Sequence, residues 1–204
     1  MKPKDIGTDS DRALLLDFQA TLEIKPEKAI KLEKDALAQI ENITADNARL
    51  VSNLHANLGG LYRMNGHPDL AREHMEKSIS LLDQFNLLHI NDSIPQIANY
   101  AMFLTEQQEP ERGISELQKL SGIIKEYHSD KCLDYAKVQE NLATIYLMTA
   151  NLSQAKTHFK RAFKIYEKIW ADEPEMIEAK YREIQELYPQ IGFSIGKTLS
   201  GLLT

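Results

Sequence analysis

Cysteine is nearly absent from this chain, because Cys132 is the only one among its 204 residues. A single thiol cannot form an internal disulfide, so the chain is not a disulfide scaffold, and a reducing compartment, the cytoplasm, is expected. Long apolar runs are missing as well. No stretch approaches roughly 18 uninterrupted apolar residues, which argues against a membrane span. No apolar segment follows residues 1–5, so no secretory signal is expected.

An excess of positive charge is also lacking. The chain carries 30 acidic and 24 basic residues, which gives a formal net charge of -6. Nucleic-acid-binding domains usually present a basic face, so nucleic acid is not expected as a partner. Hydrophobic residues make up 43% of the chain and charged residues 26%. These proportions are typical of soluble globular proteins and argue against a disordered or collagen-like chain.

A repeat of 42 residues runs through the chain. Pro26, Pro68 and Pro110 are each 42 residues apart, and positions 57, 99 and 141 in the same register are all Asn. At two further repeat positions, every copy has a similar type of residue. Positions 29, 71, 113 and 155 are small (Ala, Ala, Gly and Ala), and positions 16, 58, 100 and 142 are large and mostly apolar (Leu, Leu, Tyr and Leu). So many agreements in one register predict four copies of one unit over about residues 10–172.

Each copy has the pattern of two helices. In the second copy, apolar residues recur at helical spacing over residues 51–62. Gly66 then interrupts the pattern, and Pro68 stands where its missing N–H costs a new helix nothing. Small residues such as Gly59 and Ala71 predict that the two helices of a pair approach closely. No segment shows strand alternation, so the fold class is all-α.

The repeat resembles a known family. The segment Asn57–Tyr62, followed by Gly66 and Ala71, is similar to a tetratricopeptide repeat (TPR). The usual length of that repeat is 34 residues. The 42-residue period resembles instead the kinesin-light-chain-like subfamily, as does the run Arg161–Lys168 before Pro174. The resemblance implies a right-handed superhelical solenoid of antiparallel helix pairs, with the first helix of each pair on the concave face.

The expected organisation is one solenoid over residues 10–188, with a short lead-in over 1–9. Its units are placed at about 10–43, 44–91, 92–130 and 131–172, and a lone capping helix at 175–188. Residues 189–204 form an apolar C-terminal tail. Terminal repeats are often atypical because one of their faces meets water. Unit one is the least regular, because Glu33 stands at a normally apolar position.

The main candidate site is the series Asn57, Asn99 and Asn141. The resemblance implies that these residues lie on the concave face, where their amides would contact the backbone of an extended peptide. An amide offers both a donor and an acceptor, so it suits this task. The alternative is that each Asn bonds within or between neighbouring helices. If the units stack, the three amides form a ladder along the concave face. Unit one has Leu15 at this position, so the Asn ladder is expected to have three members.

Neighbouring groove positions are read from the same register. They include Arg63, Met64, Met102 and Met148. Methionine is flexible and common on permissive binding surfaces, so these side chains suit a ligand with apolar anchors. The alternative is that the methionines pack between units.

Catalytic, cofactor and metal sites are not expected. The six histidines show no ligand-pair spacing, and His74 and His158, at equivalent positions, are predicted to be surface residues. Cys132 has no cysteine partner, and its reactivity would need a positioned base. The segment 25–34 mixes charges and is predicted to be an exposed helix with i,i+4 ion pairs. The Gly196-Lys197-Thr198 segment lacks the spacing and the preceding strand of a P-loop.

The expected function is therefore a non-catalytic interaction module. It would bind a peptide or partner segment in the concave groove through the Asn ladder and apolar pockets. The alternative is a peptide-responsive bacterial regulator that changes its superhelical conformation when the ligand binds. Such a regulator needs a second conformational state, which a passive scaffold does not.

Self-association through the apolar tail is a third possibility, and it yields the first prediction. If the tail joins two copies, removal of residues 190–204 converts a dimer into a monomer. Light scattering after size-exclusion chromatography measures this change, and an unchanged mass after truncation contradicts the hypothesis.

Overall fold

The computed structural model describes residues 8–187 and residue 189, and these form nine α-helices and no strand. The predicted all-α class is confirmed. The helices are α1 (Asp9–Leu22), α2 (Pro26–Leu37), α3 (Ala48–Met64), α4 (Pro68–Gln84), α5 (Ser93–Glu106), α6 (Pro110–Tyr127), α7 (Leu133–Met148), α8 (Leu152–Ile169) and α9 (Pro174–Leu187). Most of the predicted lead-in and tail, including Gly196-Lys197-Thr198, lies outside the described residues.

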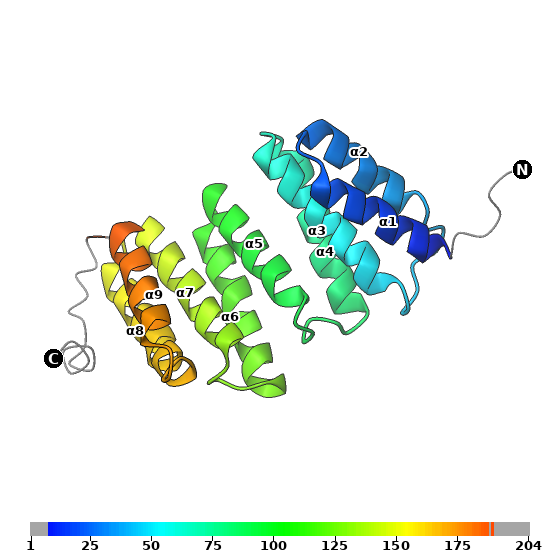
Figure 1. The fold of residues 1–204 in the computed structure, drawn as a ribbon. Helices are drawn as coiled ribbons and strands as arrows, with labels where there is room; N and C mark the ends of the chain where they lie inside the picture. Colours follow the sequence, from blue (N-terminus) through cyan, green and yellow to red (C-terminus); the bar gives the residue numbers. More distant parts are fainter. Residues whose placement is uncertain (1–7, 188, 190–204) are drawn as a thin grey trace, which may run out of the picture. The chain divides into compact units, whose positions relative to one another are not determined.

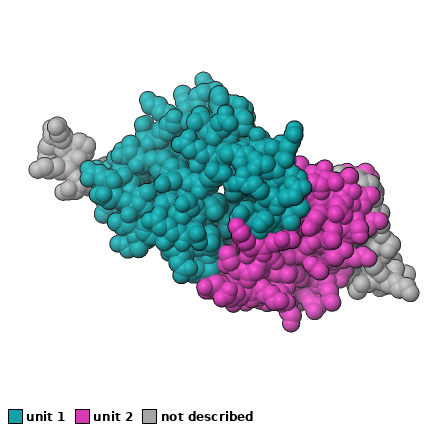
Figure 2. Space-filling model, turned by 180° about the vertical axis from the view of Figure 1, so that it is seen from behind, with its two compact units in different colours: residues 1–116 teal, residues 117–204 magenta. Residues whose placement is uncertain are grey.

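The chain folds into two compact units, residues 1–116 and residues 117–204 (Figure 2). The division falls within α6. In the first unit, α1 packs with α2 and α3 with α4 as antiparallel pairs, and in the second unit α7 packs with α8 (Figure 1). The proposed extent of a single solenoid over residues 10–188, and its unit boundaries, stay a prediction.

The helices begin at residues that suit a helix N-terminus. Pro26, Pro68 and Pro110 are the first residues of α2, α4 and α6. Proline is tolerated there because the first N–H groups of a helix have no partner inside the helix. Where the fourth copy lacks the proline, the Asn151 side chain caps α8 by accepting a hydrogen bond from the Gln154 N–H at 3.2 Å. The 42-residue proline spacing therefore marks the start of each second helix.

The turn inside three of the four helix pairs has the same backbone geometry. Gly66, Gln108 and Ala150 are 42 residues apart and have φ values of 74, 64 and 59°. The next N–H reaches back to the carbonyl five residues earlier, in the bonds His67 N to Tyr62 O (2.9 Å), Glu109 N to Leu104 O (2.9 Å) and Asn151 N to Tyr146 O (2.7 Å). This is the Schellman arrangement, which ends a helix with a left-handed residue.

Close approach between paired helices depends on small residues. A Cβ atom added to Gly113 would lie 2.5 Å from the carbonyl oxygen of Ala101, so α5 and the start of α6 meet backbone to backbone. In the next copy, Ala143 and Ala155 occupy the same two positions and are fully buried. The predicted role of the small residues is confirmed, because any larger side chain at position 113 would push the pair apart.

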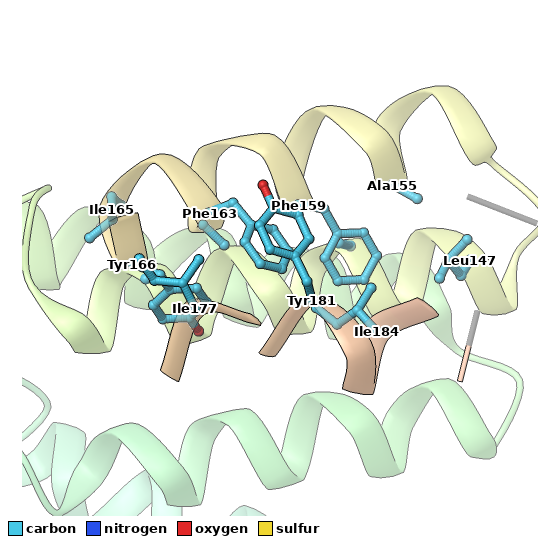
Figure 3. Close-up of a cluster of buried hydrophobic side chains, with 12 residues drawn as sticks. Leu147, Ala155, Phe159, Phe163, Ile165, Tyr166, Ile177, Tyr181 and Ile184 are labelled. Carbon is cyan, nitrogen blue, oxygen red and sulfur yellow. The ribbon is translucent and has the colours of Figure 1, made fainter. Parts of the chain in front are cut away.

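The core of the second unit is closed by α9. Phe163 of α8 stacks on Tyr181 of α9, with ring centroids 4.1 Å apart and an interplanar angle of 16°. Ile177 and Ile184 lie on the same face of α9 and are buried against α8 (Figure 3). Lys180 adds a polar attachment, since its Nζ lies 2.8 Å from Oε1 of Glu140 on α7. The helix at the predicted capping position thus covers apolar side chains that would otherwise face water.

The left-handed turns generate a stability prediction. A residue with a Cβ atom is sterically destabilised at positive φ, whereas glycine is not. We expect Ala150→Gly to raise the free energy of unfolding by about 1 kcal/mol, measured by urea denaturation. The control is Ala179→Gly, at an exposed position inside α9, which should lower stability by about 1 kcal/mol. A loss of stability in both variants would contradict the turn argument.

Candidate functional site

A pocket of about 590 Å³ opens in the first unit, and most of its lining comes from α1, α3, α5 and the turn before α5. These are the first helices of their pairs. Asn and Gln provide five lining residues, namely Asn53, Asn57, Asn91, Gln96 and Asn99. Because amides both donate and accept hydrogen bonds, the pocket is suited to polar groups such as the peptide backbone. Asp17, Arg63 and Met64 also line it.

Asn57 connects three helices. Its Nδ2 donates to Asp17 Oδ1 of α1 at 2.9 Å and to Glu33 Oε1 of α2 at 3.1 Å. The two amide hydrogens are thereby committed to bonds between neighbouring helices, which was one of the two roles considered for this residue. Within the part of the chain that the structure describes, Oδ1 has no hydrogen-bond donor. Asn57 therefore lines the pocket as a fixed amide that keeps one unbonded acceptor.

Glu33 lies behind this contact and is 1% exposed. The prediction of an exposed, mixed-charge helix over 25–34 is wrong at this residue, because the chain folds it against α1 and α3. Its Oε2 atom is buried without a hydrogen-bond partner. Burial, followed by the negative charge of Asp17, raises the pKa of Glu33 to about 8, whereas the bond from Asn57 acts in the opposite direction. The carboxyl group is thus mainly protonated at neutral pH.

A second polar network holds α3, α4 and α5 together beside the pocket. Gln96 Oε1 accepts hydrogen bonds from Ser52 Oγ at 2.8 Å and from Ser78 Oγ at 2.5 Å. Gln96 Nε2 donates to Asn53 Oδ1 at 2.5 Å. Ser52 and Ser78 are almost fully buried, so these bonds satisfy groups that would otherwise be costly to bury. The network also fixes Asn53 through its Oδ1, and among the described residues its Nδ2 has no acceptor.

Two arginine–carboxylate pairs join α3 to α5 near their ends. Arg63 donates from Nε to Glu106 Oε2 at 2.8 Å, and a second bond connects the same two groups. At the other end, Arg49 donates from Nε to Asp92 Oδ2 at 2.8 Å. Arg63 was expected in the groove, and it does line the pocket, but its charge is neutralised by Glu106.

The remaining predicted residues are distributed over both units. Asn99 lines the pocket and is exposed, and Met64 is 82% exposed there. Met102 is half-buried on α5 and is not a lining residue. Asn141 and Met148 belong to α7 in the second unit, where Asn141 is half-buried and Met148 is 51% exposed. A three-rung ladder and peptide contact by these residues stay predictions.

The comparisons with known proteins identify the repeat. Residues 93–168, which include α5 to α8, match the family model described as tetratricopeptide repeat. This part of the chain therefore belongs to the tetratricopeptide-repeat family. No curated protein matches it in sequence. Tetratricopeptide repeats typically form non-catalytic interaction scaffolds that offer extended binding surfaces.

Solved structures show the same fold. BtubC (BKLC) from P. vanneervenii is 20% identical, with a TM-score of 0.65 over 78% of this chain and 62% of that chain. A Podosopora anserina kinesin light chain with nearly identical TPR-like repeats is 14% identical, with a TM-score of 0.65 over 83% of this chain and 80% of that one. A Rap protein in complex with competence and sporulation factor is 15% identical, with a TM-score of 0.61 over 91% of this chain and 54% of that chain.

These similarities confirm the predicted helical-repeat fold class. The chain spans 62% of the length of BtubC and 54% of that of the Rap protein. Among the residues that the structure describes, no helix has the length and apolar character needed to cross a membrane. Over the same residues, no three His, Cys, Asp or Glu side chains are grouped so that they could hold a metal ion.

Asp17 is a pocket residue that sequence analysis missed. It is 42 residues before Gly59, so a carboxylate replaces a small residue, just as Glu33 replaces the apolar Met75. In the second pair, a Cβ atom on Gly59 would lie 2.6 Å from Met75 Cγ. These two positions therefore face each other across a helix pair. The signal was a charged residue at both facing positions of one helix pair.

The prediction that His74 and His158 are surface residues is wrong. His158 is 8% exposed, stacks on Tyr146 with centroids 5.3 Å apart, and lies with Nδ1 2.9 Å from Gln139 Oε1. His74 is half-buried, and its Nδ1 lies 2.9 Å from Nδ1 of His55. His74 also stacks on Tyr62, at 5.4 Å. The two helix pairs thus share one arrangement, with His55 in one and Gln139 in the other.

The histidine pair generates a prediction for the pH dependence of stability. Burial, then the neighbouring His74, lowers the pKa of His55 to about 4, and burial also lowers the pKa of His74. Unfolded histidine titrates near about 6.5. The native state therefore binds fewer protons than the unfolded state between these values, and its stability falls as the pH falls. We expect His55→Gln to flatten this decline, measured as the free energy of unfolding from about pH 7 to pH 5.

The second unit provides the reciprocal control. Gln139→His creates the same histidine pair beside His158 and should steepen the decline at acid pH. Equal slopes for the wild type and both variants would show that the pair is not a source of the acid sensitivity.

Proposed function

We propose that the chain is a non-catalytic protein-interaction module that holds a peptide or a partner segment along α1, α3 and α5. The tetratricopeptide fold supports an interaction role. The observation that carries the proposal is the amide lining of the pocket. Asn57 Oδ1 and the whole amide of Asn99 have no hydrogen-bond partner among the described residues, although both residues line the pocket. Those atoms are available to an extended peptide backbone, which offers one N–H and one C=O per residue.

The groove residues then have separate tasks. Asn57 accepts from a backbone N–H, because its own N–H groups are already bonded to Asp17 and Glu33. Asn99 both donates and accepts. Met64 supplies a flexible apolar contact beside them. In the second unit, we propose the same peptide contact for Asn141. Met148 lies about two helical turns further along α7.

A peptide-responsive regulator is the second candidate. Its support is the fold that the chain shares with the Rap protein bound to competence and sporulation factor. A regulator of this kind would change its compactness when the ligand binds, whereas a passive scaffold would not. Small-angle X-ray scattering with and without the identified ligand distinguishes the two candidates.

The prediction for the interaction module uses the asparagine whose whole amide is open in the pocket. We expect Asn99→Ala to weaken binding of the partner by about fivefold, because a lost hydrogen bond contributes about 1 kcal/mol. Partners are first captured from a lysate of the source cell, and the affinity of each purified partner is then measured by calorimetry. Asn57→Ala is avoided because it would also break two bonds between helices.

The matched control is Gln84→Ala, which removes an exposed amide from α4 rather than from a first helix. It should bind like the wild type. Circular dichroism establishes that all variants keep their helical content. Equal affinities for the wild type, the asparagine variant and the control would contradict binding through these amides.

A further inference from the structure

The charges around the pocket are unevenly compensated. Arg63 is neutralised by Glu106, and Asp92 is neutralised by Arg49. Over the described residues, Asp17 forms no ion pair, and its hydrogen bonds are to two uncharged groups, the amide of Asn57 and the protonated carboxyl of Glu33. The pocket therefore keeps one uncompensated negative charge.

The donors beside this charge are already used within the described part of the chain, because the Asn57 amide and the Glu33 carboxyl both bond to Asp17. Asn57 Oδ1 is an acceptor with no donor there. Asn57 cannot turn its donors toward a ligand without breaking its bonds to Asp17 and Glu33. A ligand group that fits this place must donate hydrogen bonds and should carry positive charge.

The first helix pair also contains polar groups that lower its stability, at positions where the second pair has a small and an apolar residue. Asp17 and Glu33 stand where Gly59 and Met75 make an apolar contact in the second pair. Glu33 leaves Oε2 buried and without a partner. Two carboxyl groups in place of small and apolar residues break the packing pattern of the repeat. Such departures are expected at functional positions, where binding rather than stability decides the residue.

We propose that Asp17, together with Asn57 Oδ1, binds the cationic side chain of a lysine or arginine in the peptide segment that the pocket holds. This inference rests on the proposed function, since it names the chemistry of one residue of the ligand. The aliphatic part of a lysine or arginine side chain can lie along Met64, which is 82% exposed and lines the same pocket. The charged end then reaches the acceptors at Asp17.

Binding of a cation changes the protonation of Glu33. Besides burial, the groups that act on the pKa of this carboxyl are Asp17 of α1, whose charge and hydrogen bond raise it, and Asn57 of α3, whose bond lowers it. A cation at Asp17 offsets the first effect and favours the ionised form of Glu33. A proton is therefore released on binding, and affinity for a cationic ligand increases as the pH rises toward about 8.

The experiment uses the full chain and four pools of labelled peptides. Each pool contains ten-residue peptides with blocked ends and a varied background of Ala, Ser, Thr and Leu, and the pools differ only in a central Lys, Arg, norleucine or Glu. Norleucine has nearly the shape of lysine without the charge. Fluorescence anisotropy should show binding of the Lys or Arg pool about tenfold tighter than binding of the norleucine pool. The pool that binds better tells which cation the site prefers.

Two substitutions locate the effect. Asp17→Asn should remove the preference for the cation and leave the affinity for the norleucine pool unchanged. Asp83→Asn, an equal change of charge at an exposed position of α4, should retain the preference. Equal binding of the charged and uncharged pools by the wild type overturns the inference and leaves the proposed function standing. A preference that persists in Asp17→Asn also overturns it. Failure of every pool to bind contradicts peptide binding by this groove, and the inference with it.

The pH dependence provides an independent readout. Between about pH 6 and pH 8, the affinity of the wild type for the cationic pool should rise. Glu33→Gln should keep the preference for the cation, because glutamine can still accept the bond from Asn57, but it should abolish the rise. A rise of the same size in Glu33→Gln would show that another group releases the proton and would overturn the coupling to Glu33.

Discussion

The tight left-handed turn inside three of the four helix pairs is the constraint on which both units depend. A left-handed residue at positions 66, 108 and 150 reverses the chain, and small residues let the two backbones meet. At Gly113 there is no room for even one additional carbon atom beside the carbonyl of Ala101. Once the pair is closed in this way, its larger apolar side chains must pack toward the neighbouring pair. The stacked aromatic contacts of α8 and α9 are the result of that requirement (Figure 3).

The first pair departs from this pattern, and the departure creates the pocket chemistry. Asp17 and Glu33 occupy positions at which the second pair has Gly59 and Met75. Their charges would repel each other if both ionised, so Glu33 retains its proton to a higher pH than usual. Asn57 bridges the two groups and lines the pocket with one unbonded acceptor. A repeat that elsewhere serves stability thus has one copy in which polar groups are held in a fixed and costly arrangement.

The polar contacts between first helices explain how the pocket keeps its form. Arg63 and Arg49 connect α3 to carboxylates of α5 or of the turn before it, and Gln96 joins α5 to both α3 and α4. Exposed ion pairs contribute little on their own. The bonds of Gln96 are different, because they satisfy buried hydroxyl groups that would otherwise have no partner. The amides of the groove are therefore presented by helices with a defined separation.

The 42-residue period, the prolines and the small residues determined the all-α class, the helix pairs and the segments that turn, because each depends on local spacing and backbone preference. The same register placed Asn57, Asn99 and Asn141 at one repeat position. It could not show that Asn57 bonds to Asp17 and Glu33, that Arg63 is paired with Glu106, or that His158 is buried. The partner of a polar side chain comes from another helix, often in a different repeat unit, and the distance between them exists only in the folded chain. The tertiary structure alone therefore decided which amides remain open to a ligand and which charge is left uncompensated.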